Sequence, residues 1–188
     1  RYIKSVEIVE VSDVDMTQVT GTVGGRFIFH HMLWGTAQLD SEGNLERQFT
    51  APFPVHEVGR NADFFDDGAG KLLRAGSAIY SDSVHLHSNG RDTTAHLEVG
   101  FRFHDRGYEP EYRESIGFNG NGVDISVVPN QKDQELHAYT TLGQHTKVIS
   151  FEPHLHAPGD RMCLEAIWGH QIETLSCVGY DHNWVRSY

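Results

Sequence analysis

Histidine is the residue type in this chain whose clustering points most directly to chemistry. The chain has 188 residues and 13 histidines, against 15 lysines and arginines together. Neutral imidazole is the commonest transition-metal ligand in proteins, so a cluster of histidines is a candidate metal site. We single out three clusters and interpret most other histidines as ordinary surface residues. The clusters are His30 with His31, His85 with His87, and His154 with His156; the histidines set aside include His56, His96, His104, His137, His145 and His170.

The second and third clusters each have the pattern His-x-His. In a β-strand, residues two apart point to the same face, so both imidazoles can converge on one ion, with a third ligand from another strand. The chain has no cysteine-rich motif, which argues against a structural zinc site of the finger type. The clusters therefore favour copper, or an open zinc or iron site.

The first cluster, in the segment GGRFIFHHMLWG (24–35), poses a geometric problem. Neighbouring side chains of a regular strand point to opposite faces, so His30 and His31 could not both bind one ion from such a strand. If they share a metal, the backbone must bulge, as strands often do beside active sites. We therefore predict an irregular strand at these two histidines. Met32 should pack in the core rather than bind the metal.

Other common catalytic patterns are missing from the sequence. It contains no G-x-S-x-G elbow, no H-E-x-x-H motif, no G-x-G-x-x-G motif and no P-loop. The acidic segment 63–71 could bind calcium, but we interpret it as a solvated loop. The formal net charge of −11 argues against nucleic acid and membrane surfaces as partners. No apolar run approaches the ~18 residues of a membrane helix.

The two cysteines, Cys163 and Cys177, lie in a segment with the pattern strand, turn, strand. If the turn centres on His170, Trp168 lies opposite Ile172, and the same register places one cysteine opposite the other. Directly opposed residues bring their Cβ atoms to roughly the separation that a disulfide needs. We expect a disulfide and hence an oxidising setting, secreted or periplasmic. The alternative is a pair of buried free thiols in a reduced cytoplasm.

Short segments rich in β-branched and aromatic residues, separated by turn signals, run through most of the chain. No alternation of strands with long helical patterns is present, so we expect an all-β antiparallel sandwich or jelly roll. Residues 133–142 could form either a short helix or a strand. The predicted strands are KSVEIVEV (4–11), GRFIFHHML (25–33), SVHLH (83–87), TAHLEVGFRF (94–103), VDISVV (123–128), TKVISFEPHLH (146–156), MCLEAIW (162–168) and IETLSCV (172–178).

A domain boundary is expected in the polar segment 104–115, which contains a glycine and a proline. It divides the chain into a first jelly-roll domain, residues 1–110, and a second one, residues 111–188. About 75 residues are few for a two-sheet sandwich with its own core. We therefore expect a partial second domain, completed by a missing C-terminal segment, by strands of its neighbour or by a partner chain. Because the first residue is Arg1 rather than Met, we also expect a processed or trimmed chain, from which a signal peptide could have been lost.

The segment FHHMLWG (29–35) resembles the HHM motif of the copper type II, ascorbate-dependent monooxygenases, the family of the peptidylglycine and dopamine β-monooxygenases. SVHLHSNGRD (83–92) resembles the later segment that supplies the third ligand of that family's first copper. FEPHLHAPGDRM (151–162) resembles the family's H-x-H-x-x-G motif, and ETLSCVGYDHNWVRSY (173–188) is similar to the bacterial members. The resemblance covers nearly the whole chain.

This resemblance implies two jelly-roll domains, each presenting one copper ion to a cleft between them. The first copper would take electrons from an external reductant such as ascorbate. The second would activate dioxygen and hydroxylate a C–H bond of a small molecule or peptide. The implied ligands are His30, His31 and His85 for the first copper, with His87 as an alternative to His85, and His154 and His156 for the second, catalytic copper. His85 should then arrive from a strand next to that of His30 and His31.

The chain departs from the family pattern in two places. The family's second copper has a methionine ligand well downstream of the H-x-H motif, and this sequence ends at Tyr188, before that strand should arrive. Met162 is close by in sequence but not at the family's position, so it is a weaker candidate for this ligand. His182 stands where the relatives tend to have phenylalanine, and it could add an imidazole near His154 and His156.

Two other functions stay open at this point. A metal-stabilised, non-catalytic β-sandwich could form part of an extracellular assembly or of a multi-subunit redox complex, with structural histidines. A zinc hydrolase could use the same ligands, but no obvious glutamate general base accompanies either cluster in the sequence. None of these residues identifies the substrate.

Overall fold

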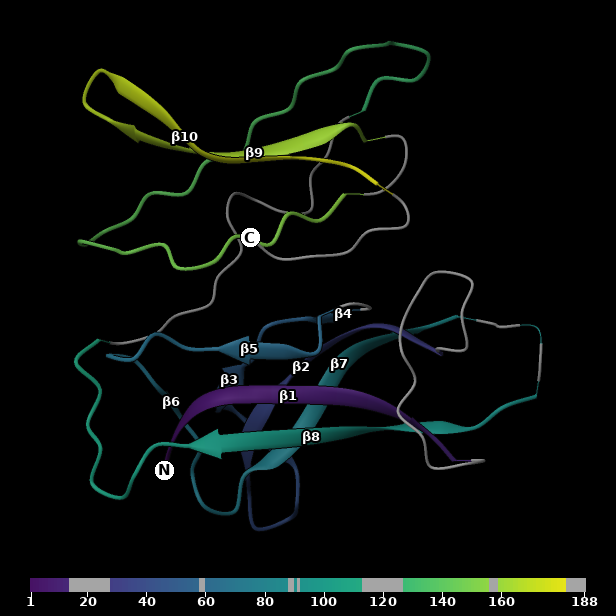
Figure 1. The fold of residues 1–188 in the computed structure, drawn as a ribbon, viewed down its shortest axis with the longest axis vertical. Helices are drawn as coiled ribbons and strands as arrows, with labels where there is room; N and C mark the ends of the chain where they lie inside the picture. The colour runs from purple at the N-terminus through teal and green to yellow at the C-terminus, as the bar shows by residue number, and fades with distance from the viewer. Residues whose placement is uncertain are drawn as a thin grey trace. The chain divides into compact units, whose positions relative to one another are not determined.

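The computed structural model describes residues 1–13, 28–57, 60–87, 90, 92–112, 127–155 and 159–181. Within these ranges all regular structure is β-strand, and the paired strands are antiparallel (Figure 1). The predicted all-β antiparallel sandwich is therefore confirmed. The strands are β1 (Tyr2–Ser12), β2 (Phe29–Leu39), β3 (Leu45–Pro52), β4 (His56–Glu57), β5 (Ala62–Phe64), β6 (Lys71–Leu72), β7 (Ala78–Leu86), β8 (Ala95–Phe103), β9 (Arg161–Trp168) and β10 (Gln171–Gly179).

The first sheet is built around β1, which has partners along both edges. β8 follows one edge along nearly the whole strand, and β5 and β6 share the other edge (Figure 1). The sequence of β1 alternates, so Val6 and Ile8 are buried while Glu7 between them is exposed. A register shift between Ile3 and Ser5 lets Ile3 also enter the core.

The second sheet repeats this arrangement around β2. β7 follows one edge of β2, and β3 and β4 share the other edge. Met32 and Trp34 lie two positions apart in β2 and are both buried, as the alternation of a strand predicts. Near its N-terminal end, β2 thus has β7 on one side and β4 on the other, which places residues of three strands next to each other.

The two sheets pack against each other through an apolar core. The ring of Trp34 stacks on Phe53, with centroids 4.5 Å apart, and its Nε1 donates to the carbonyl oxygen of Pro54 at 2.9 Å. The polar atom of the buried indole is therefore satisfied. Met32 belongs to this core, as predicted. The core residues are Ile3, Val6, Ile8, Met32, Trp34, Phe53 and Phe65, with Leu73, Leu97, Val99, Phe101 and Phe103 packed against them.

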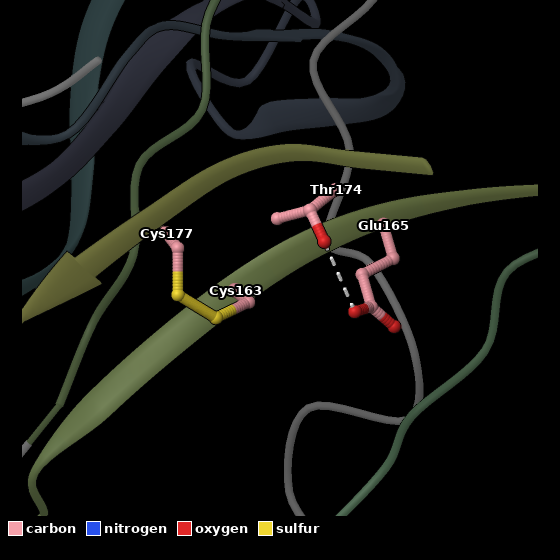
Figure 2. Close-up of a disulfide and its surroundings, with 4 residues drawn as sticks. All are labelled: Cys163, Glu165, Thr174 and Cys177. Carbon is pink, nitrogen blue, oxygen red and sulfur yellow. Dashed lines mark hydrogen bonds between the residues drawn. A yellow bond between two sulfur atoms is a disulfide. The ribbon is translucent and has the colours of Figure 1, made fainter. Parts of the chain in front are cut away.

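β9 and β10 form a two-stranded hairpin that a disulfide crosses. Cys163 on β9 and Cys177 on β10 are directly opposed and bonded, so the predicted disulfide is confirmed (Figure 2). On the same pair of strands, Oγ1 of Thr174 donates to Oε1 of Glu165 at 3.4 Å (Figure 2). The described part of the chain has no free cysteine.

The register behind the disulfide prediction is wrong at the turn. Trp168 lies opposite Gln171 rather than Ile172, because the turn contains two residues instead of three. A register shift after Thr174 then inserts one extra residue, Leu175, into β10. This bulge moves the pairing by one position and brings the two cysteines into opposition.

Contacts between Cα atoms divide the chain into two compact units. One unit consists of Arg1–Glu114 together with Ile149–Tyr188, and the other of Ser115–Val148. The boundary after residue 114 lies in the segment where a domain boundary was expected. The assignment of residues 1–110 and 111–188 to two jelly-roll domains stays a prediction.

Two segments do not form the expected regular structure. Residues 133–142 are neither helix nor strand. The described part of TKVISFEPHLH, residues 146–155, is not the predicted strand either. A strand needs a partner for its backbone hydrogen bonds, and within the described chain no strand pairs with these residues. Pro153 also lacks the N–H that a ladder requires. Of the predicted strand at 123–128, only the last two residues are described, and they are not in a strand.

Candidate metal centre

β2 is irregular at its adjacent histidines. Phe29 pairs with Leu86 and His31 pairs with His85, so His30 is an extra residue on β2 without an opposite residue on β7. Such a bulge breaks the alternation of side chains. The ring centroids of His30 and His31 are 5.0 Å apart. The predicted irregularity, and the arrival of His85 from a neighbouring strand, are confirmed.

His31 is the middle member of a row of three side chains. His85 on β7 and Glu57 on β4 are both directly opposite it, one on each side. Directly opposed residues of neighbouring strands lie on the same face of a sheet. The ring centroids of His31 and His85 are 4.1 Å apart. Because His31 is only 7% exposed while His85 is exposed, the row runs from a buried centre to a solvent-accessible rim.

His30 has a second imidazole beside it. The ring centroids of His30 and His87 are 4.3 Å apart. The backbone N–H of His87 donates to the carbonyl oxygen of Ile28 at 2.7 Å, which ties the chain after β7 to the start of β2. Nδ1 of His30 is buried and has no hydrogen-bond partner. A buried nitrogen without a partner is unusual, and a metal ion would satisfy it.

His154, from the third cluster, also lies beside β2. Its ring centroid is 5.9 Å from that of His31, and its Nδ1 lies 3.5 Å from Oε1 of Glu57. One described histidine of the third cluster therefore lies next to the first cluster. Of the other candidates, His156 and His182 lie outside the described residues, and Met162 lies in β9 opposite Val178, where its role as a ligand stays a prediction.

The imidazoles are gathered, but they are not arranged as a coordination shell. Among the described residues, no three His, Cys, Asp or Glu side chains are placed so that they could hold one ion. The rings lie against each other instead, with interplanar angles of 48° for His30 and His31 and 36° for His31 and His85. The residues fit a metal by the type of their donor atoms and by the unpaired Nδ1 of His30. Binding would require the rings to turn about their side-chain torsions.

Burial keeps the two histidines of β2 neutral. Burial first, and then the nearby His87, lowers the pKa of His30. Burial and the neighbouring His85 lower the pKa of His31, against a smaller opposing effect of Glu57. A histidine must be neutral to bind a metal. The lowered pKa values therefore leave both rings in the binding form at neutral pH.

Glu57 and His154 form a pair of opposite charge. The hydrogen bond to Glu57 raises the pKa of His154. Burial alone would raise the pKa of Glu57, but its hydrogen bond with His154 and the nearby cationic groups hold that pKa below its ordinary value. An ionised carboxylate only accepts hydrogen bonds, so Nδ1 of His154 carries the proton. When this ring is neutral, Nε2 is the nitrogen that carries the lone pair.

Glu57 is a site residue that sequence reasoning missed. The sequence shows no obvious glutamate general base at the histidine clusters, whereas in the structure Glu57 lies opposite His31 and 3.5 Å from Nδ1 of His154. Glu57 is far from the clusters in sequence, and only the pairing of β4 with β2 places it opposite His31. No local pattern signals such a pairing.

Glu10 is a second missed residue, and it holds the strand that carries the site. It is buried, and its two carboxylate oxygens accept the backbone N–H groups of Ile28 at 2.9 Å and Phe29 at 3.0 Å. These are the two residues just before the bulge. A signal was available, because alternation places Glu10 on the same face of β1 as the buried Ile8. A charged residue that faces a core needs a partner.

His56 is not the surface residue that it was expected to be. It is 5% exposed and lies opposite Met32, because it alternates with Glu57 in β4 and so faces the core. Its Nδ1 has no hydrogen-bond partner, and burial lowers its pKa. His104 is half-buried and stacks on Tyr108, with centroids 3.7 Å apart. The surface interpretation is confirmed for three of the other histidines: His137, His145 and His170.

No family model, curated protein or solved structure matches the chain. A fold by itself does not determine function, so the function has to be derived from the geometry of the site. In the part of the chain that the structure describes, no helix is both long and apolar enough to cross a membrane.

Proposed function

We propose that the protein is a copper-dependent monooxygenase, which hydroxylates a C–H bond with dioxygen and an external reductant. The observation that carries this proposal is the bulge in β2, which brings the rings of His30 and His31 together on a strand next to His85. Three imidazoles accommodate copper in both of its oxidation states. The resemblance to the copper type II monooxygenases assigns the first copper to the same three histidines.

In this proposal, histidine side chains bind the two copper ions, and their burial sets the protonation state in which they bind. His30, His31 and His85 would hold the first copper, and His154 with His156 would hold the second. Bound copper would supply electron transfer and oxygen chemistry, which the amino acids alone do not provide. Burial keeps the two β2 histidines neutral and ready to bind.

The setting that we propose is extracytoplasmic. The disulfide between β9 and β10 supports a secreted or periplasmic location, because disulfides persist in oxidising compartments. His85 and His154 are exposed, so a small-molecule or peptide substrate and a reductant such as ascorbate could reach the site from solvent. A partner chain or a further C-terminal segment would complete the second copper site.

Metal analysis of protein purified without added metal tests this function. We expect two coppers per chain, and His30→Ala and His154→Ala should each lose one of them. His170→Ala, which removes an exposed imidazole in the turn between β9 and β10, should lose neither. Wild-type protein without copper, or both site variants with full copper content, would contradict the proposal.

A zinc hydrolase is a second candidate, because Glu57 supplies the general base that this reaction needs. Its side chain is 12% exposed, lies 3.5 Å from Nδ1 of His154, and is directly opposite His31. Its lowered pKa keeps it ionised, which is the form of a general base. Zinc in place of copper in the purified protein, with ester or peptide hydrolysis that Glu57→Gln abolishes without metal loss, would favour this function.

A further inference from the structure

One acidic and one basic residue lie next to each other at the end of β4. Glu57 and Arg60 are joined by an isolated β-bridge, and the N–H of Arg60 donates to the carbonyl oxygen of Glu57 at 2.9 Å. These contacts keep the two residues together on the edge of β2 that carries β4. The segment of the third cluster has a similar pair, Glu152 and His154.

The two pairs of residues contact each other crosswise, so that each acidic residue meets the basic residue of the other pair. Nη1 of Arg60 forms an ion pair and hydrogen bond with Oε2 of Glu152, while Oε1 of Glu57 lies 3.5 Å from Nδ1 of His154. Side-chain exposure is 8% for Arg60 and 24% for Glu152, so water is largely excluded from this pair. In the second pair, Glu57 is 12% exposed and His154 is 52% exposed. Ion pairs from which water is largely excluded are stronger and less screened than those on an open surface.

The direction of the Arg60 side chain is itself fixed. Oδ1 of Asp63 accepts from Nη2 at 2.6 Å and from Nε at 2.9 Å. A guanidinium is planar and rigid, so these two bonds determine where Nη1 points. Arg60 is thus held in the orientation in which it meets Glu152.

We propose that Glu57 and Arg60 form a charge clamp, which positions residues 149–155, and with them His154, at the histidines of β2. In the described chain, residues 149–155 pair with no strand, so side-chain contacts have to fix their place. Arg60 and Glu57 provide two such contacts, one to each side of Pro153. In this role Arg60, Glu57 and Glu152 are positioning residues. Their effect on a metal at His154 rests on the proposed function, whereas the clamp itself does not.

Backbone NMR relaxation of the metal-free protein tests the clamp independently of copper. It suits residues 149–155, which in the described chain pair with no strand. In Glu152→Ala, backbone order parameters in 149–155 should fall from about 0.85 toward about 0.6, because a charge-assisted hydrogen bond is lost. Arg60→Ala should do the same, and the double variant should add little to either single change, since both remove the same contact. Glu173→Ala, which removes an exposed glutamate of β10, is the control and should leave this segment unchanged. Unaltered order parameters in Glu152→Ala, or a fully additive fall in the double variant, would overturn the clamp.

Copper titration then tests what the clamp does for the site. Glu152→Ala should weaken the copper that depends on His154 by about 10- to 100-fold, as loss of an outer contact to a ligand does, and should leave the copper at His30 unchanged. If wild-type protein binds no copper while the order-parameter results hold, the proposed function fails and the clamp stands. If His154→Ala loses a copper that Glu152→Ala binds as tightly as wild type, the positioning role is wrong.

Discussion

His30 and His56 share an unusual feature, a buried Nδ1 without a hydrogen-bond partner. Burial lowers the pKa of both. The ring of His30 lies beside those of His31 and His87, so a metal ion could use its lone pair. His56 faces the core opposite Met32, where no other imidazole is described next to it. The same feature suits a ligand at the first position and is only destabilising at the second.

Replacing His56 by leucine should make the stability of the metal-free protein less dependent on pH. The folded pKa of His56 is below its ordinary 6.5. As the pH falls below 6.5, His56 therefore binds a proton in the unfolded chain but not in the folded chain, and the free energy of unfolding decreases. Leucine cannot titrate, so unfolding free energies in urea at about pH 7.5 and about pH 5 should converge, by up to about 1.4 kcal/mol per pH unit. An undiminished pH dependence in His56→Leu would show that the ring titrates normally.

His96 should titrate in the opposite direction. Its Nδ1 lies 2.5 Å from Oδ1 of Asp13, and this hydrogen bond raises its pKa above 6.5. Its contribution to stability is therefore fully present below the unfolded pKa and is lost as the pH rises through the folded one. An NMR titration should find the His96 ring titrating above 6.5, and Asp13→Asn should return it toward that value. A wild-type His96 that titrates at or below 6.5 is the contradicting result.

At the scale of elements, the first sheet holds the strand of the site through Glu10. Glu10→Gln replaces one acceptor oxygen by an NH₂ group, which cannot accept from Ile28 or Phe29. One buried N–H then loses its partner, so urea unfolding should show a loss of about 1–3 kcal/mol. Exchange of the Phe29 and His30 amides should also accelerate. The matched control is Glu7→Gln on the exposed face of the same strand, and equal losses in both variants would contradict this role.

The elements differ in how far the sequence predicts them, and the difference follows the range of the interactions. The bulge at His30 could be predicted because two adjacent ligands cannot share an ion from a regular strand. The two cysteines could be paired because they lie on consecutive strands of one hairpin. That prediction succeeds through two compensating shifts, a shorter turn and the extra Leu175, and neither is visible in the pattern.

The parts that could not be predicted depend on contacts between distant segments. Glu57 enters the site only because the short β4 adds to the edge of β2. Residues 146–155 alternate like a strand, but alternation does not provide a neighbouring strand, and ion pairs from Glu57 and Arg60 hold the segment instead. A hydrophobic pattern predicts which face of a segment is apolar, whereas the partner depends on the whole fold.

At the scale of the whole molecule, the described core and the β9–β10 hairpin are formed by different parts of the chain. Every residue of the core cluster lies between Ile3 and Phe103, and the first two histidine clusters lie in the same range. β9 and β10 contribute no residue to that cluster as described. The ladder between the two strands and the disulfide across it are the described interactions that stabilise the hairpin.

Reduction of the disulfide should therefore loosen the hairpin and leave the sandwich intact. Cys163 and Cys177 are 14 residues apart, and a cross-link that closes a loop of about 15 residues stabilises by about 3 kcal/mol. A two-stranded hairpin without such a cross-link is at best marginally stable in water. Under a thiol reductant, amides of β9 and β10 should lose protection against hydrogen exchange, while those of β1 and β2 keep theirs. Loss of protection in β1 to the same extent would mean instead that hairpin and sandwich unfold as one cooperative unit.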